Sequence, residues 1–279
     1  MIGYVDVGGG NRAAYGAGVL DYCEDHNILF DYCVGVSAGS ANLASYVARQ
    51  TKRNMRFYTI YNLRRQAIKP ANIFLHRNVI NFDYLYGEVN GSKGEDPLDY
   101  HTLSSSPIAF KIVLCRADNG QPVYVDKSEI AFDDYGPFAA SSNLPVFNNA
   151  FEWKGVKYYD GGYGDPIPFK KALEDGCDKV VITLTLPKDY FRTNEKEVKR
   201  ARHMKEFPAI RQAMINKAEL YNQQLREALE LEKQGKVLII APAEKPQIKT
   251  LGKDVSEIIK LHDIGYQDAE KIVAFLDQQ

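Results

Sequence analysis

The order of apolar segments in the first 49 residues constrains the fold more than any other feature of this chain. Residues 2–7 have the alternating, β-branched pattern of a strand, and residues 13–26 have the apolar spacing of a helix. Residues 32–36 predict a second strand and residues 38–49 a second helix. Because strand, helix and strand in this order form a crossover between parallel strands, the segment predicts the start of a parallel sheet.

The rest of the chain continues this pattern. Further strands are predicted over residues 108–116, 123–125, 156–159, 179–186 and 236–240. Further helices are predicted over residues 137–143, 170–175, 200–234 and 254–279. The expected fold is a three-layer α/β/α arrangement with a mostly parallel central sheet. We expect a single domain over residues 1–279, with its core at 2–186 and an extension at 187–279.

The composition excludes several classes of function. The chain has 35 Lys and Arg against 36 Asp and Glu, a net charge of -1, so no basic excess indicates nucleic-acid binding. The N-terminus lacks a signal-peptide pattern, and no apolar run reaches the roughly 18 residues that a membrane span requires. No C-x-x-C pair occurs among Cys23, Cys33, Cys115 and Cys177, which disfavours a zinc ribbon or a thioredoxin-type motif. Four cysteines in a chain of this length do not make a disulfide scaffold, so we expect free thiols and a cytoplasmic protein. We expect no metal and no cofactor.

Gly35 to Gly39 form a G-x-S-x-G sequence between a predicted strand and a predicted helix. In that context a nucleophile elbow exposes its serine, here Ser37, at a helix N-terminus whose dipole favours developing negative charge. The flanking Gly35 and Gly39 would let the backbone turn sharply and let a substrate approach. The structural alternative is a tight turn with a capping serine.

Gly8, Gly9 and Gly10 follow the first predicted strand and precede the first predicted helix, where backbone amides suit an anion. A nucleotide phosphate is one alternative. However, the loop satisfies neither G-x-G-x-x-G nor a P-loop, and the second strand ends in Ser37 rather than in a ribose-binding acid. Since the loop lies one βα unit before the serine, an oxyanion hole for acyl transfer is the better interpretation, with a plain turn as the structural alternative.

A nucleophilic serine needs a base, and Asp160 begins an Asp-Gly-Gly sequence directly after a predicted strand. The chain order Ser37, Asp160, His262 would also fit a triad hydrolase. His262 lies in an amphipathic segment, and an elbow at residue 37 comes early for the α/β-hydrolase fold. We therefore favour Asp160 as the base and keep the triad as an alternative.

These three sequences together resemble the patatin-like phospholipase family, and its bacterial branch most closely. They are Gly-Gly-Gly-Asn-Arg at 8–12, Gly-Val-Ser-Ala-Gly at 35–39 and Asp-Gly-Gly at 160–162. The resemblance covers roughly residues 2–186, and the sequences at 140–145 and 165–168 also look like the family. One departure is Ala13, where the family usually has Gly.

The resemblance implies a Ser–Asp dyad without histidine, in which Ser37 is the nucleophile and Asp160 the base. The glycines at 8–10 would form the oxyanion hole, and Arg12 would steady that loop. The implied activity is hydrolysis of phospholipids or other fatty-acyl esters through an acyl-enzyme, with peripheral membrane contact and without a cofactor. The alternatives are a soluble carboxylesterase or thioesterase, and a non-catalytic lipid-binding or regulatory protein that keeps the fold. The oligomeric state stays open.

The region around residues 54–105 interleaves aromatic and basic side chains. The aromatic rings would line the acyl site, and the cations would meet anionic head groups. A packed core and a solvated face are the ordinary alternatives, and a mobile lid is left open. The residues concerned are the aromatic Phe57, Tyr58, Tyr61, Phe74, Phe82, Tyr84 and Tyr86, and the basic Lys52, Arg53, Arg56, Arg64, Arg65 and Lys69.

Overall fold

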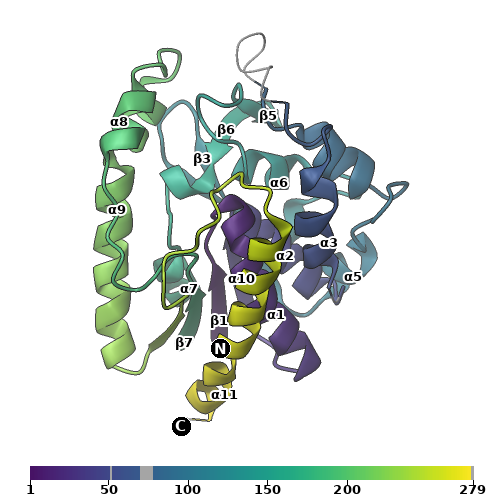
Figure 1. Ribbon diagram of the computed structural model, residues 1–279, viewed down its shortest axis with the longest axis vertical. Coiled ribbons are helices and arrows are strands. Elements are labelled where there is room, and N and C mark those ends of the chain that lie inside the picture. Colours follow the sequence, from purple (N-terminus) through teal and green to yellow (C-terminus); the bar gives the residue numbers. More distant parts are fainter. Residues whose placement is uncertain (51, 70–77, 278–279) are drawn as a thin grey trace.

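The structure is a computed structural model that describes residues 1–50, 52–69 and 78–277 (Figure 1). Phe74 and the last two residues of the helix predicted at 254–279 lie outside the described residues. The strands are β1 (Ile2–Asp6), β2 (Tyr32–Val36), β3 (Ala109–Arg116), β4 (Pro122–Asp126), β5 (Phe151–Trp153), β6 (Val156–Asp160), β7 (Lys179–Thr183) and β8 (Val237–Ile240).

Helical segments alternate with these strands through most of the chain. The α-helices are α1 (Ala14–Asp25), α2 (Ala38–Val47), α3 (Arg53–Thr59), α5 (Tyr100–Ser105), α6 (Gly136–Ser141), α7 (Phe169–Glu174), α8 (Glu195–Ala201), α9 (Pro208–Lys233), α10 (Val255–Asp268) and α11 (Glu270–Leu276). Shorter turns are the 3-10 segments η1 (Gly10–Ala13), η2 (Tyr61–Leu63), η4 (Lys127–Glu129) and η5 (Gly161–Tyr163), and the π-helical segment η3 (Asp83–Val89).

The strands form one sheet in the order β5-β6-β3-β2-β1-β7-β8, with β4 also paired to β3. β3, β2, β1, β7 and β8 are parallel to one another, which confirms the mostly parallel sheet predicted from the first βαβ segment. β4, β6 and β5 are antiparallel additions at one edge. The strands predicted at 108–116 and 123–125 are β3 and β4, which form an antiparallel hairpin.

Two predicted elements are shorter than expected. The strand expected to reach residue 186 ends at Thr183. The single helix expected over residues 200–234 is interrupted between α8 and α9, which begins at Pro208. Phe207 has an extended backbone (φ −122°, ψ 93°) because a residue that precedes proline avoids the helical region.

Helices cover both faces of the sheet, which confirms the three-layer arrangement (Figure 1). Successive side chains of a strand point to opposite faces. Tyr4 of β1 belongs to an apolar core shared with α1, α2 and α10, while the next residue, Val5, belongs to a second core shared with α7 and α9. Figure 1 accordingly shows α9 and α1 on opposite sides of the strands.

The C-terminal segment shares this sheet and this core. β8 extends the sheet by pairing in parallel with β7, and α10 packs along α1. The two helices approach closely at Gly18, where a Cβ atom would lie 2.0 Å from the carbonyl oxygen of His262. The His262 ring adds a contact across the same interface, with Nε2 3.0 Å from Asp21 Oδ2.

No helix among residues 1–50, 52–69 and 78–277 combines the length and the apolarity needed to cross a bilayer. All four cysteines are buried free thiols, as their spacing predicts.

Candidate active site

The carboxyl ends of three neighbouring parallel strands bring the predicted loops together. Gly8 follows β1 closely, Ser37 follows β2, and Thr185 lies just beyond β7, which flanks β1 on its other side. Ligands of open α/β sheets bind at this edge, because the loops after parallel strands meet there. The Thr185 hydroxyl donates a 3.3 Å hydrogen bond to the carbonyl oxygen of Gly8, which links the loops after β7 and β1.

The register of the sheet sets Ser37 and Asp160 on two sides of β3. Val36 pairs with Val113 of β3, and Ser37 is the next residue along β2. On the opposite side of β3, Asp160 pairs with Leu114, the next residue along that strand. The two predicted dyad residues therefore reach the same height on the strands that flank β3.

Ser37 has a strained backbone, with φ 54° and ψ −128°, at the start of α2. A left-handed φ in a residue that is not glycine costs free energy, and it is typical of a nucleophile elbow. Hydrogen bonds hold the turn in place. The Ser37 amide donates to Ser141 Oγ at 2.8 Å, Ser141 Oγ donates to the Val113 carbonyl at 2.8 Å, and Ser40 Oγ donates to the Ser37 carbonyl at 2.6 Å.

The glycines that flank the elbow are required by close packing. A Cβ atom at Gly39 would lie 2.2 Å from the carbonyl oxygen of Asp6, and one at Gly35 would lie 2.5 Å from the Cα atom of Ser40. Larger residues would push the elbow away from β1. The G-x-S-x-G pattern thus fits α2 tightly against the strand that precedes the glycine loop.

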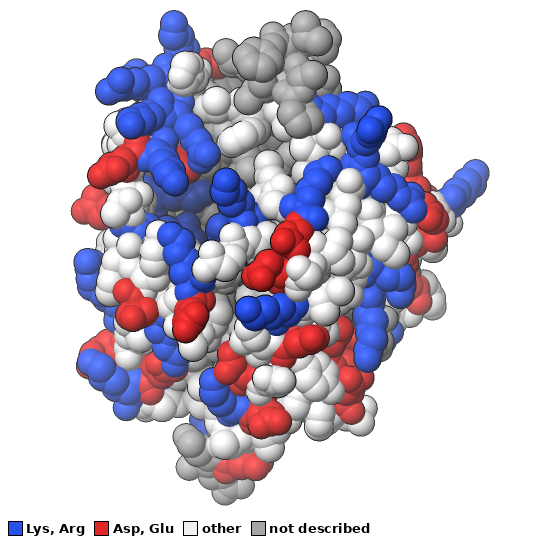
Figure 2. All heavy atoms as spheres, viewed as in Figure 1, with Lys and Arg blue, Asp and Glu red and all other residues white. Residues whose placement is uncertain are grey.

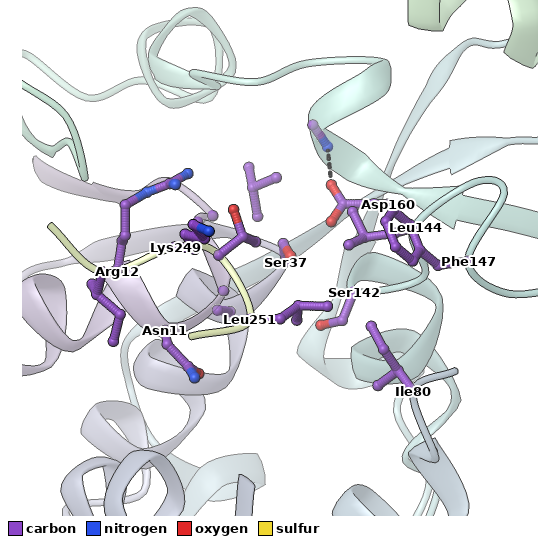
Figure 3. Close-up of a pocket in the computed structure, with 18 of the residues that line it drawn as sticks. Asn11, Arg12, Ser37, Ile80, Ser142, Leu144, Phe147, Asp160, Lys249 and Leu251 are labelled. Atoms are coloured by element: carbon purple, nitrogen blue, oxygen red, sulfur yellow. Dashed lines mark hydrogen bonds between the residues drawn. The ribbon is translucent and has the colours of Figure 1, made fainter. Parts of the chain in front are cut away.

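Asp160 is a buried carboxyl group at the end of β6, with 4% of its surface exposed. Its Oδ1 accepts a 2.8 Å hydrogen bond from the Gly162 amide (Figure 3). Burial raises the pKa of Asp160, and the positive charge of Lys217 together with a hydrogen bond from Ser37 opposes that rise. A raised pKa makes the carboxylate a better proton acceptor than an ordinary surface aspartate.

The glycine loop lies directly against the elbow. A Cβ atom at Gly8 would lie 2.5 Å from Ser37 Cβ and 3.3 Å from Ser37 Oγ. Gly10 has a φ of +57°, and the following amide, that of Asn11, donates a 2.8 Å hydrogen bond to the Thr250 carbonyl. Ala13 has an ordinary φ of −71°, so alanine fits where the family usually has glycine.

A cavity of about 930 Å³ contains both dyad residues and all three loop glycines. Its lining has two chemically different parts. Figure 3 shows Ile80, Leu144 and Phe147 on the side of Asp160, and Arg12 and Lys249 on the other side of Ser37. A cavity of this size that joins apolar walls to a few polar groups is typical of a small-molecule or lipid site.

The aromatic residues of the 54–105 region divide between this cavity and the core. Phe57, Tyr58, Phe82 and Tyr86 line the cavity, as the acyl-site interpretation predicts. The basic residues of the same region do not line it within the described part of the chain. Four of them form ion pairs, among them Arg56, whose Nε lies 2.8 Å from Asp96, and Arg64, which lies 2.6 Å from Glu95. Their predicted contact with anionic head groups stays a prediction.

Two other predicted residues differ from their expected roles. His262 does not line the cavity and instead contacts Asp21 and Asp263, so the geometry gives no support to the triad alternative. Arg12 lines the cavity, and its buried Nε has no hydrogen-bond partner among the described residues. Its predicted role in steadying the loop stays a prediction.

The sequence analysis missed several residues that shape the site. Ser141 anchors the elbow and lies in the 140–145 sequence already noted as family-like, which was the available signal. Asp6 is a fully buried carboxyl group below the elbow; burial raises its pKa to about 7, and Asn42 donates to it at 2.9 Å. Lys217 on α9 lies near Asp160, and no local pattern of charges distinguishes it from other lysines of that helix.

Comparisons with known proteins agree with this geometry. Residues 7–173 match the family model of the patatin-like phospholipases, and residues 207–278 match a domain of unknown function, DUF6363. A curated relative, the uncharacterized protein YjjU of Escherichia coli (strain K12), is 30% identical over 197 residues, which cover 69% of this chain and 54% of that protein. The chain thus spans about half the length of this relative.

A solved structure shares the fold. The crystal structure of VipD from Legionella pneumophila superposes with a TM-score of 0.52 at 12% sequence identity, over 98% of this chain and 66% of that one. At this identity the likeness concerns the fold alone. The family model covers more than half of the described chain, including the glycine loop, the elbow and Asp160. This chain therefore belongs to the patatin-like phospholipase family.

Proposed function

We propose that this protein is a serine lipid acyl hydrolase that cleaves carboxylic ester bonds through Ser37 and Asp160. The observation that carries the proposal is the strained Ser37, which lies against the glycine loop and shares one cavity with a buried carboxyl group. The apolar part of that cavity suits a fatty-acyl chain.

In the proposed mechanism Ser37 Oγ attacks the ester carbonyl while the Asp160 carboxylate accepts the hydroxyl proton. The amides of residues 8–10 and the N-terminus of α2 stabilise the negative charge on the carbonyl oxygen. The tetrahedral intermediate collapses, and the alcohol leaves with the proton from Asp160. Water then attacks the acyl-enzyme, Asp160 accepts its proton, and the fatty acid leaves while Ser37 regains its hydrogen.

Turnover of p-nitrophenyl hexanoate by purified variants tests the proposal. Ser37→Ala should lower kcat by about 10⁴-fold or more, and Asp160→Asn by about 10²- to 10⁴-fold. Asp165→Asn is a matched control, because Asp165 is another buried aspartate that hydrogen-bonds to Tyr124 and Gln224 and does not line the cavity. Wild-type turnover by Asp160→Asn would contradict the proposed role of this carboxylate.

We further propose that residues 1–279 work as one domain. We also propose that the protein acts at the cytoplasmic face of a membrane. The pairing of β8 with β7 and the packing of α10 on α1 support the first part, because they join the two matched segments in one sheet and core. The buried free thiols support the second. A chain that ends at residue 186 should then fail to unfold cooperatively in urea, whereas an independent C-terminal domain would leave a cooperative core.

A further inference from the structure

The charge of the cavity differs from that of the chain as a whole. The chain has a net charge of -1. Yet seven Lys and Arg residues line the cavity, against the two acidic residues Asp160 and Glu197. Apart from Arg12, the cations all come from the C-terminal part of the chain and lie outside the matched residues 7–173. They are Arg192, Lys196, Arg200, Lys217, Lys245 and Lys249.

Most of these cations have no carboxylate partner in the part of the chain that the structure describes. Arg200 pairs with Glu197 at 2.9 Å, but Arg192 and Lys217 contact aromatic rings instead. The Arg192 guanidinium lies 3.6 Å from the Tyr221 ring centroid, and Lys217 Nζ lies 3.5 Å from that of Tyr163. These contacts orient the two cations, and neither forms a direct ion pair with a carboxylate among the described residues, although the nearby charges of Asp160 and Glu197 act on Lys217.

The cost of this arrangement is visible at two arginines. The Nε atoms of Arg12 and Arg192 are both buried without a hydrogen-bond partner among the described residues. Burial and the nearby charge of Arg192 lower the pKa of Arg12 to about 10. Buried cations without partners are costly, and an anion with several oxygen acceptors would relieve that cost.

The cations gather at one place on the surface (Figure 2), and two of them, Arg12 and Lys249, lie on the side of Ser37 away from the apolar residues (Figure 3). Figure 2 shows Lys and Arg side chains crowded around a hollow near α8 and the adjacent end of α9. Figure 3 shows Lys249 and Arg12 on the side of Ser37 away from Ile80, Leu144 and Phe147. An ester bound with its carbonyl at Ser37 and its acyl chain on the apolar side would direct its alcohol part toward the cations.

We infer that the C-terminal segment builds a subsite for the phosphate-bearing, net-negative head group of a glycerophospholipid substrate. This inference rests on the proposed function and deepens it by assigning the substrate class. Several guanidinium and ammonium groups favour phosphate oxygens and disfavour a choline cation in the same place. Head groups such as phosphoglycerol fit this chemistry, and phosphocholine fits it less well.

The test uses monomeric substrates, so that binding to a membrane surface does not contribute. Dihexanoyl phosphatidylglycerol, dihexanoyl phosphatidylcholine and p-nitrophenyl hexanoate share one acyl chain and differ in the charge of the leaving part. The wild type should prefer the phosphatidylglycerol over the phosphatidylcholine by roughly tenfold or more in kcat/KM. The double variant Arg192→Gln/Lys249→Gln should lose about 10- to 100-fold on the phosphatidylglycerol, mainly through KM, and less than about twofold on the p-nitrophenyl ester.

A matched control removes the same charge elsewhere. Lys233→Gln/Lys260→Gln changes two exposed lysines of α9 and α10 that do not line the cavity, and it should leave all three activities unchanged. The Arg192 backbone stays held by two hydrogen bonds to the Asn222 side chain, so its substitution should leave the fold intact.

Equal loss on all three substrates, or equal wild-type activity on the two phospholipids, would overturn the subsite. If the wild type cleaves none of the three esters, the proposed function fails separately. Calorimetric binding of dihexanoyl phosphatidylglycerol then decides the subsite. A tenfold weaker Kd in the Arg192→Gln/Lys249→Gln variant would support it, and an unchanged Kd would overturn it.

Discussion

The two walls of the cavity differ in origin as well as in chemistry. The apolar wall comes from the segments around residues 57–86 and 142–147, inside the residues that match the patatin-like family. The cationic wall comes from residues 192–249, beyond that match. One cavity therefore combines residues from the segment that matches the family with residues from the C-terminal extension.

The basic residues near the two walls differ in whether they form ion pairs. In the segment that supplies the apolar wall, Arg53 and Arg56 lie 3.8 and 2.8 Å from Asp96, so their charges are paired within the fold. On the second wall, Arg192 and Lys217 lie against aromatic rings and form no direct ion pair within the described structure. Paired cations stabilise the protein, whereas unpaired cations in a cavity are available to a ligand.

The largest effect should come from the loop that both walls share. Gly8→Ala places a methyl group 2.5 Å from Ser37 Cβ, which forces the loop or the elbow to move. We expect a loss of about 100- to 1000-fold in kcat on neutral and anionic esters alike, as for removal of an oxyanion-hole donor. Steady-state kinetics on both substrates, with circular dichroism as a check of folding, measure this. A loss on only the neutral or only the anionic ester would contradict the view that this loop serves both kinds of substrate.

A change in the apolar wall should alter acyl-chain preference alone. Leu144→Ala removes apolar contact worth about 0.8 kcal/mol per buried methylene, so the decanoate-to-acetate ratio of kcat/KM should fall by about tenfold. Leu229→Ala is the matched control, because this leucine of α9 is also half-buried but packs against the second apolar core and does not line the cavity. An equal fall in the control, or a change in head-group preference, would break the division between the walls.

One cation of the second wall should also act on the base. Asp160 must be ionised to accept a proton, so activity falls as the pH drops through its raised pKa. The charge of Lys217 lowers that pKa, so Lys217→Met should raise it further. On a neutral ester the acidic limb of kcat/KM should move up by about 0.5 to 1 pH unit. An unmoved or lower limb would show that Lys217 does not influence the base.

The smallest effect should come from a basic residue in the segment that supplies the apolar wall. Arg56→Gln breaks the ion pair with Asp96 and should change kcat/KM on dihexanoyl phosphatidylglycerol by less than about twofold, because Arg56 does not line the cavity. The same assay measures the effect. A tenfold loss would give this residue a part in substrate binding and remove the contrast between the walls.

The sequence predicts the parallel part of the sheet well because its signals are local. β1, β2, α1 and α2 begin and end close to the predicted residues, since a strand or helix pattern and its flanking glycines lie within a few positions of each other. The antiparallel edge was only partly predicted. β5 is three residues long, too short for an alternating pattern, and it pairs only through its hairpin with β6.

The sequence predicts the catalytic loops of the cavity better than its cationic wall. The glycine loop, Ser37 and Asp160 carry compact motifs, and the cavity brings all of them together. Arg192, Lys217 and Lys249 carry none, because they come from two loops and a helix that meet only after β8 and α10 have joined the fold. The charges of a sequence show where cations lie along the chain, and only the fold shows which of them lack a partner.

The central claim is that Ser37 is an activated nucleophile that depends on Asp160. Labelling with a fluorophosphonate probe, followed by mass mapping of the modified residue, tests it directly in the wild type and in Asp160→Asn. We expect the label on Ser37 in the wild type and a labelling rate at least about tenfold lower in the variant. A folded wild type that takes no label at Ser37, or a variant that takes it equally fast, would contradict the account.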